Sequence, residues 1–259
     1  MVVTDPRPSH QVAAVAGVAG VEAVVFDWYA TLGRPLVDGW WTKLRELIVA
    51  SGGTIDEEAI LQWQNLPIDH LGASGSKTSY DAWITERLRA LLRASSVPER
   101  RIAQAVAEGE SMRADERVAL VDGAVATVEA LRAAGLVVAL CSNWDWDLDR
   151  HLAHNGIRDH FDLVVCSAIV GYRKPHRAIF DVVLDGLGID AGSILFVGDD
   201  LEADIEGATA AGMRPVHAAW ATPCGSSHSD SVACCASFDE LLALPELAGV
   251  RPHGEWLQR

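Results

Sequence analysis

The sequence has few cysteines, few basic side chains and no long hydrophobic run. Its five cysteines are irregularly spaced and form no even disulfide framework, and a globular chain of 259 residues does not need disulfides to fold. No run approaches the length of a membrane-spanning helix. The N-terminal segment HQVAAVAGVAG lacks the basic and leucine-rich regions of a secretory signal. We therefore expect free thiols and a cytoplasmic protein.

Positive charge is scarce. Lys and Arg number 21 against 36 Asp and Glu, so the formal net charge is -15. A surface this acidic repels nucleic-acid backbones and anionic lipid headgroups. We therefore expect a small-molecule substrate, with no nucleic-acid or membrane partner, and a monomer or homodimer. Hydrophobic residues make up 49% of the chain, which is enough for one large domain or two smaller ones.

Five short apolar runs alternate with helical patterns along the chain. They are AVVFD at 23–27, LVVALCS at 136–142, FDLVVCS at 161–167, ILFVGDD at 194–200 and PVHAAW at 215–220. Strands that alternate with helices form a parallel, doubly wound sheet. The sequence therefore predicts the α/β class with a Rossmann-like core.

A long segment between the first two runs has no comparable strand pattern. Helices are predicted at 40–53, at 56–65 after an Asp56 cap, and at 79–95, and a further helix at 121–135 returns the chain to the sheet. Crossovers between parallel strands are normally much shorter, so we expect a separate helical domain that caps the strand ends. The predicted parts are an N-terminal tail at 1–20, a core at 21–37 and 119–245, a cap at 38–118 and a C-terminal tail at 246–259.

Polar side chains stand at the carboxyl ends of the predicted strands, where open α/β sheets bind ligands. Asp27 ends an otherwise apolar run, and a carboxylate in this place more often takes part in chemistry than in packing. The fourth run leads into GDDLEAD, which holds Asp199, Asp200 and Asp204 within six residues. Clustered acids repel one another and favour a compensating cation, for which we expect Mg²⁺. The alternative is an acidic first turn that suits the helix dipole.

With Ser142, Asn143 and Lys174 at further strand ends, the motifs resemble those of the haloacid dehalogenase (HAD) superfamily of hydrolases. The resemblance runs from about Val21 to Trp220, and the helical insertion matches the family's first type of cap. It implies that Asp27 is a nucleophile that forms an aspartyl intermediate, that Ser142 binds a substrate oxygen, and that Lys174 neutralises charge. It also implies that Thr31 and Asn143 bind the substrate. The residues that it implies for Mg²⁺ are Asp27, Tyr29 through its carbonyl, Asp199, Asp200 and Asp204.

Tyr29 departs from the commonest phosphatase pattern. Phosphatases of the family carry a second Asp here as general acid and base, and a Tyr with an ordinary pKa of about 10 does not readily replace it near neutrality. The segment DWYATL instead resembles the D-x-Y-G-T-L motif of the dehalogenase branch, with Ala30 in place of Gly. Asn143 after Ser142 also resembles that branch.

The fourth motif favours phosphate. Dehalogenases need no metal and tend to carry Ser and Asn where this chain has Asp199 and Asp200. They also hold the departing halide with a cap Arg roughly thirty residues after the nucleophile. Near that distance this chain offers Asp56, Glu57 and Glu58, with Arg34 and Arg45 closer in. We therefore predict Mg²⁺-dependent hydrolysis of a small phosphate ester, with haloacid-type hydrolysis at carbon and a non-catalytic binding protein as alternatives.

Three further sets of residues have open roles. Asp145 and Asp147 are candidates for the missing general acid, or caps of the helix that follows them. Five tryptophans close to the first two motifs line a crevice or pack the cap on the core, namely Trp28, Trp40, Trp41, Trp144 and Trp146. Cys224, His228, Cys234 and Cys235 lie within twelve residues, but their spacing matches no common zinc pattern, so we expect a loop with free thiols.

Overall fold

The structure is a computed structural model that describes residues 20–36, 39–65, 67–224 and 232–250. The chain divides into two compact units. The core unit comprises Met1–Arg34 and Leu120–Arg259, and the helical unit comprises Pro35–Ala119. The predicted N-terminal tail and His228 lie outside the described residues, apart from Gly20.

A six-stranded parallel sheet forms the centre of the core unit, in the order β5-β4-β1-β6-β7-β8. All five predicted strands are present, and the predicted α/β class is confirmed. The sequence did not indicate the short edge strand β8. The strands are β1 (Ala23–Phe26), β4 (Val137–Ser142), β5 (Leu163–Cys166), β6 (Ile194–Gly198), β7 (Arg214–Ala218) and β8 (Ala233–Cys235).

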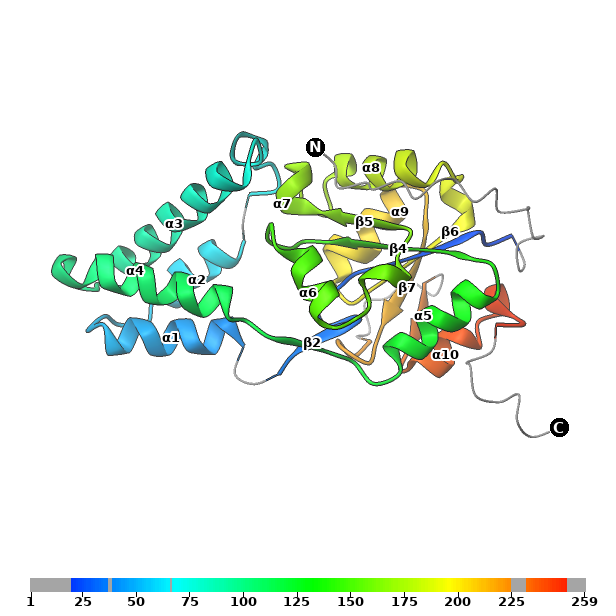
Figure 1. The fold of residues 1–259 in the computed structure, drawn as a ribbon, viewed down its shortest axis with the longest axis horizontal. Coiled ribbons are helices and arrows are strands. Elements are labelled where there is room, and N and C mark those ends of the chain that lie inside the picture. The colour runs from blue at the N-terminus through cyan, green and yellow to red at the C-terminus, as the bar shows by residue number, and fades with distance from the viewer. Residues whose placement is uncertain (1–19, 37–38, 66, 225–231, 251–259) are drawn as a thin grey trace. The chain divides into compact units, whose positions relative to one another are not determined.

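Helices cover both faces of this sheet, with α8 and α5 on opposite sides (Figure 1). The helices are α5 (Ala124–Ala133), α6 (Leu148–His154), α7 (Ser167–Val170), α8 (Arg177–Leu187), α9 (Gly207–Ala210) and α10 (Phe238–Leu242). A π-helical segment, Leu201–Glu206, follows β6, and short 3₁₀ turns span Arg158–His160, Ala191–Ser193 and Pro245–Leu247.

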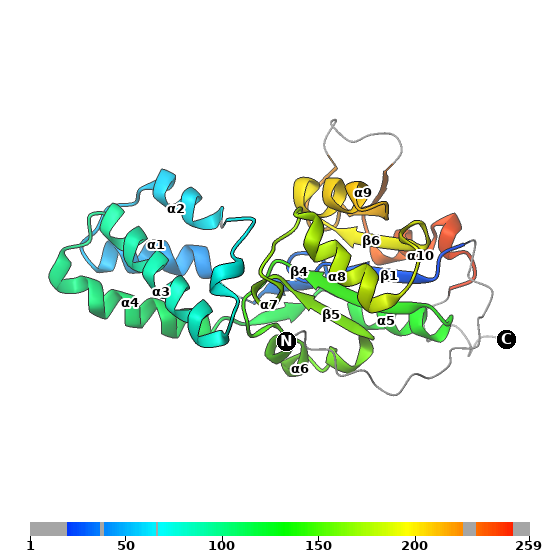
Figure 2. The ribbon, with the colours of Figure 1, turned by 90° about the horizontal axis from the view of Figure 1, so that it is seen from above.

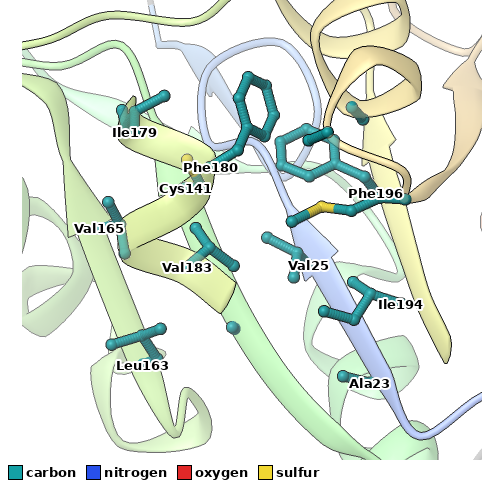
Figure 3. Close-up of a cluster of buried hydrophobic side chains, with 14 residues drawn as sticks. Ala23, Val25, Cys141, Leu163, Val165, Ile179, Phe180, Val183, Ile194 and Phe196 are labelled. Atoms are coloured by element: carbon teal, nitrogen blue, oxygen red, sulfur yellow. The ribbon is translucent and has the colours of Figure 1, made fainter. Parts of the chain in front are cut away.

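Alternate residues of the strands form one buried face of the sheet. Figure 3 shows Ile179, Phe180 and Val183 of α8 directed at this face, and the rings of Phe180 and Phe196 lie 5.5 Å apart. The strand residues of this cluster are Ala23, Val25, Ala139, Cys141, Leu163, Val165, Ile194 and Phe196. The two-residue period of a strand explains the alternation. Burial of this apolar face holds the strand ends in fixed positions.

The strand order determines where a ligand site can form. Chain order reverses beside β1, where Phe26 pairs with Leu140 of β4 on one side and with Val197 of β6 on the other. The amide of Asp27 donates to the carbonyl of Val197 at 2.9 Å. Parallel α/β sheets bind ligands at the carboxyl ends of the strands at such a reversal. Asp27 and Asp199 directly follow the adjacent strands β1 and β6 and therefore lie at this position.

The described residues of the helical unit form the helices α1 (Trp40–Ala50), α2 (Glu57–Gln64), α3 (Lys77–Ala94) and α4 (Glu99–Ala114), which Figure 2 labels, with a 3₁₀ turn at Leu71–Ala73. Three were predicted, and Asp56 accepts the amide of Ala59 at 3.0 Å as the predicted cap. The sequence did not indicate α4. A Cβ at Gly109 of α4 would lie 2.8 Å from Cδ2 of Leu88, so this glycine allows α3 and α4 to pack closely.

Two short strands pair where the chain crosses between the units, β2 (Gly33–Pro35) and β3 (Val118–Leu120). Packed structure extends past the predicted end of the core at residue 245. Leu247 and Val250 are buried, and Glu246 pairs with Arg214 at 2.7 Å. Among the described residues, no helix combines the length and the apolar character that crossing a bilayer requires.

Candidate active site

Lys174 lies between two carboxylates at the carboxyl end of the sheet. Its ammonium group donates to Oδ1 of Asp27 at 2.7 Å and to Oδ1 of Asp204 at 2.6 Å, and all three side chains are buried. Burial alone would lower the pKa of Lys174, but the charges of Asp204 and Asp27 outweigh it and raise that pKa above its usual value. Lys174 therefore stays protonated and holds both carboxylates in place.

Asp204 is positioned by the π-helical segment after β6 and by a glycine at the end of β6. A Cβ at Gly198 would lie 2.2 Å from Oδ2 of Asp204, so this carboxylate requires a glycine there. The same Oδ2 accepts the amide of Asp200 at 3.1 Å. Burial raises the pKa of Asp204, and Lys174 opposes the rise. Asp204 thus depends on Lys174 for its charge.

Asp199 follows β6 and accepts hydrogen bonds from two hydroxyl groups. Thr31 donates to its Oδ1 at 3.3 Å and Thr222 donates to its Oδ2 at 3.0 Å. Burial, and then the negative charge of Asp27, raise the pKa of Asp199 to about 6. Thr222 was not indicated by the sequence, because it lies in a loop outside the recognised motifs. Only the fold of this loop brings Thr222 beside Asp199.

Three carboxylates at this edge offer oxygen atoms that lie within 4.8 Å of one another, from Asp27, Asp199 and Asp204. Three carboxylates against one ammonium leave an excess of negative charge, and oxygen donors of this kind suit Mg²⁺. The group therefore fits a hard divalent cation. Asp200, predicted from the sequence for the same metal, is exposed and lies outside this group, and its Oδ1 caps the π-helical segment by accepting the amide of Ala203 at 2.8 Å.

Asn143 and Lys174 are joined by two hydrogen bonds. The amide of Lys174 donates to Oδ1 of Asn143 at 2.8 Å, and Nδ2 of Asn143 donates to the carbonyl of Lys174 at 3.0 Å. These bonds hold the backbone that carries the ammonium group. Ser142 is the buried last residue of β4 and lies at the same edge of the sheet as Asp27. Thr31 is also buried, and its carbonyl accepts Nε1 of Trp220 at 2.9 Å.

Tyr29 is half-buried in a tight turn after Asp27. Its ring centroid lies 5.8 Å from that of Trp144, and Ala30 has a φ of 65°. This left-handed conformation favours glycine. Ala30 thus adopts, in this turn, a conformation that a glycine adopts more readily.

The candidate replacement acids differ in their surroundings. Asp147 accepts Nη2 of Arg150 at 2.5 Å and lies 3.4 Å from Nε2 of His151. Burial would raise the pKa of Asp147, but these two partners outweigh it and hold the pKa well below its usual range. A carboxyl this acidic carries no proton to donate near neutrality. Asp145 is half-buried, and its carbonyl accepts Sγ of Cys166 at 3.1 Å.

The candidate halide ligand Arg45 is engaged within the helical unit. Its Nη2 donates to Oε2 of Glu57 at 2.7 Å and its Nε to Oε1 at 3.3 Å. The bond to Glu57 raises the pKa of Arg45 and lowers that of Glu57. Arg45 thus remains a cation that already holds a carboxylate.

Among the tryptophans, packing is observed for Trp28 and Trp40. Trp28 is fully buried in the core unit. Trp40 is 7% exposed in the helical unit, with its ring centroid 6.0 Å from that of Trp63. These two side chains supply buried area to the units in which they lie.

The expectation of free thiols throughout the chain is wrong. Cys224 and Cys234 form a disulfide, whereas Cys141, Cys166 and Cys235 are free and buried. Irregular spacing of five cysteines gives no sign that one pair, ten positions apart in the sequence, meets in the fold. His217 of β7 also lies beside this pair, and nothing in the sequence indicated it.

The comparisons with known proteins agree with this architecture. The haloacid dehalogenase-like hydrolase family matches residues 21–212. The mouse (Mus musculus) protein "haloacid dehalogenase-like hydrolase domain-containing protein 3" is 30% identical over 80% of this chain and 84% of its own length. A phosphoserine phosphatase from Thermus thermophilus is 37% identical over 75% of this chain and 68% of that protein.

One solved structure illustrates the fold. A 2-haloacid dehalogenase from Pseudomonas syringae matches with a TM-score of 0.61 at 21% identity, over 86% of this chain and 97% of that one. At that identity the likeness shows the fold alone, and enzymes of different chemistry share it. The family match over residues 21–212, together with the mouse relative, shows that the chain belongs to the haloacid dehalogenase-like hydrolases and is an enzyme of that family.

Proposed function

We propose that this hydrolase is a Mg²⁺-dependent phosphatase that acts on a small phosphate ester through an aspartyl phosphate on Asp27. The observation that carries the proposal is the group of three carboxylates, Asp27, Asp199 and Asp204, around a single buried lysine. Such an excess of negative charge is costly without a cation. Hydrolysis of a carbon–halogen bond needs no metal, so it does not explain why three carboxylates lie together.

The proposed chemistry assigns a separate task to each buried group. A carboxylate oxygen of Asp27 attacks phosphorus, and the bond from phosphorus to the leaving oxygen breaks. Water then attacks the aspartyl phosphate, which releases inorganic phosphate and restores Asp27. Lys174 stays protonated and offsets the charge on the phosphoryl oxygens, and Ser142 donates a hydrogen bond to one of them. Mg²⁺, when bound by Asp27, Asp199 and Asp204, would supply further positive charge to the phosphoryl group.

Two predicted substrate contacts are better explained as positioning residues. Asn143 uses both ends of its amide on the backbone of Lys174, and Thr31 donates to Asp199. We propose that Asn143 aims the ammonium group and that Thr31 orients a metal-binding carboxylate. We further propose that the helical unit serves as the cap that selects the substrate.

The second candidate function is hydrolysis at carbon of a 2-haloacid. The observation that favours it is Tyr29, which stands in the left-handed turn where phosphatases of the family carry a second Asp. The engagement of Arg45 with Glu57 counts against it, because that cation is already paired. The phosphoserine phosphatase relative also favours phosphate as the substrate class.

An activity panel distinguishes the two candidates. The purified chain is assayed against phosphate esters and 2-haloacids in parallel, with Mg²⁺ and after treatment with a chelator. Asp27→Asn serves as the control for contaminating phosphatases. We expect phosphate release that needs Mg²⁺ and that disappears in this variant. Halide release without metal would overturn the proposal in favour of the second candidate, and absence of both activities would leave a binding protein.

A further inference from the structure

We propose that His217, Cys224 and Cys234 form a second metal site, which in its reduced state binds a thiophilic divalent cation such as Zn²⁺. His217 Nδ1 and the two sulfur atoms lie within 4.8 Å of one another. This set differs from the cysteine-rich cluster considered from the sequence, because its imidazole comes from a strand. The proposal is independent of the phosphatase activity.

Strand pairing brings two of the three ligands together. His217 of β7 pairs in register with Cys234 of β8. Residues paired in this way on neighbouring strands point to the same face of the sheet. Cys224 lies beyond the end of β7 and reaches the same imidazole. Its Sγ lies 3.4 Å from Nδ1, and Sγ of Cys234 lies 4.0 Å from it. All three positions belong to the core unit.

The imidazole is oriented as a metal ligand. Its Nε2 lies 3.1 Å from the carbonyl oxygen of Asp199, which can only accept, so Nε2 carries the proton. The neutral ring therefore has its lone pair on Nδ1, which faces the two sulfur atoms. Metal-binding histidines usually donate their other ring N–H to a carbonyl or carboxylate in this way.

The separations suit a tetrahedral ion. With Zn–S of about 2.3 Å and Zn–N of about 2.0–2.1 Å, a nitrogen and a sulfur ligand lie about 3.5 Å apart. The observed distances of 3.4 and 4.0 Å lie on either side of that value. Two thiolates on one zinc lie about 3.8 Å apart. The Cα atoms of the cysteines are 6.7 Å apart, which lies near the upper end of the disulfide range and leaves the sulfurs room to separate.

Reduction of the disulfide opens this site. Both cysteines are exposed, so a dithiol reductant reaches the bond, supplies two electrons and two protons, and becomes a disulfide itself. Each thiol then loses a proton when the divalent cation binds, and the oxidation state of sulfur does not change. The metal-bound and disulfide states therefore exclude each other.

Cobalt binding by the full chain tests the proposal. The protein is reduced with a phosphine, freed of metals with a chelator, and titrated with Co²⁺ in excess Mg²⁺, which occupies the carboxylate site. We expect a sulfur-to-cobalt charge-transfer absorption with tetrahedral ligand-field bands, both displaced by Zn²⁺. Oxygen ligands alone give no sulfur charge transfer, so the readout is specific to the proposed site.

Matched cysteine variants identify the ligands. Cys224→Ser and Cys234→Ser should lose the charge-transfer absorption, whereas Cys235→Ala should keep it, because Cys235 is the buried neighbour of Cys234 and not one of the ligands. Oxidation of the wild type by a disulfide should also abolish the absorption. Circular dichroism checks that each variant is folded.

Three results would overturn the proposal. The first is a reduced, folded wild type with both thiols accessible and no charge transfer. The second is absorption that persists in both serine variants. The third is a disulfide that cannot be reduced without unfolding, which would make the pair purely structural. None of these results depends on whether the enzyme hydrolyses phosphate.

Discussion

The two units use charged side chains in different ways. In the core unit the side chains of Lys174, Asp27 and Asp204 are at most 10% exposed and form two ion pairs through one ammonium group. In the helical unit the pair of Lys77 and Asp81 lies on the surface, with side chains 59% and 41% exposed. Water screens the surface pair, whereas burial makes each charge in the core depend on its partner.

The buried charges of the core unit and the exposed charges of the helical unit therefore have different roles. Burying like charges beside one another is unfavourable, and a structure that does so needs a compensating cation. The surface pair needs none. We therefore expect substitutions of the buried group to affect catalysis, stability and metal binding, and the matched substitution in the helical unit to affect none of them.

The largest expected effect is the loss of activity in Asp27→Asn. The amide lacks the anionic oxygen needed for attack, so turnover should fall by about 10⁴-fold or more. The melting temperature should hold or rise, because the volume is unchanged and one repulsive charge is removed. Steady-state kinetics and thermal unfolding check both parts. Substantial activity that is not due to deamidation would contradict the covalent mechanism.

Lys174→Met should be the most destabilising change. Methionine fills similar space but leaves Asp27 and Asp204 without their shared cation, and breaking a buried pair costs about 3–5 kcal/mol. Denaturant unfolding without metal measures this cost. The double variant with Asp204→Asn should recover part of it, since one uncompensated charge is then absent. A loss under about 1 kcal/mol would show that the buried pairs behave like surface pairs.

Mg²⁺ affinity should depend on pH through Asp199. Its pKa is raised to about 6, so below that pH a proton must leave before the carboxylate binds the metal. Affinity should fall by about tenfold for each pH unit below 6 and level off above it. Calorimetry in buffers of different ionisation enthalpy measures the affinity and the protons released. A flat profile between pH 4 and 6 would remove Asp199 from the ligand set.

The same shift has a consequence for stability without metal. The folded-state pKa of Asp199, about 6, exceeds the ordinary value of 3.8, so the folded protein binds more protons than the unfolded chain between these values. The contribution of Asp199 to the stability of the metal-free protein should therefore fall as pH rises through that window. Asp199→Asn should flatten this part of the profile.

Tyr29→Asp should change activity by about tenfold. If the enzyme is a phosphatase without its usual general acid, the new carboxylate can protonate a poor leaving group, so hydrolysis of an alkyl phosphate should rise by about 10-fold while that of p-nitrophenyl phosphate changes little. The ratio of the two rates is the measurement. A folded, Mg²⁺-binding variant that is inactive on both esters would favour chemistry at carbon.

The smallest effect is expected for Lys77→Ala on the surface of the helical unit. The pair with Asp81 is exposed, and a lysine at the first residue of α3 is poorly placed for the helix dipole. Stability should stay within about 0.5 kcal/mol of the wild type, with activity unchanged. A loss of stability comparable to that of Lys174→Met would contradict the distinction between buried pairs in the core unit and exposed pairs in the helical unit.

Local patterns determined much of the fold. Apolar runs with the period of a strand located five strands of the parallel sheet, and capping residues such as Asp56 located helix starts within a few positions. α4 was missed because its sequence, ERRIAQAVAEGESMRA, is largely polar and contains Gly109. Such patterns can be recognised because they depend on neighbours in the chain.

Asp27 and Asp204 could be predicted as site residues because they lie in acidic positions at strand ends, whereas Lys174 was predicted only through the resemblance to the family's motifs. The sequence could not show that Asp200 caps a helix while Asp204 meets Lys174, since both acids lie in the same segment. Gly198 leaves the space that the carboxylate of Asp204 occupies, and Asp200 stands at the N-cap of the π-helical segment.

Neighbouring residues are thus enough to predict the α/β class, the helical insertion and the set of polar residues at the strand ends. Which of these residues share a site, and that His217 meets Cys224 and Cys234, depends on the folded chain. Periodicity and capping act over a few neighbouring residues, whereas contacts such as that of Asp27 with Lys174, 147 positions apart, depend on strand order and register. His217 meets Cys234 because β8 pairs with β7 in one particular register.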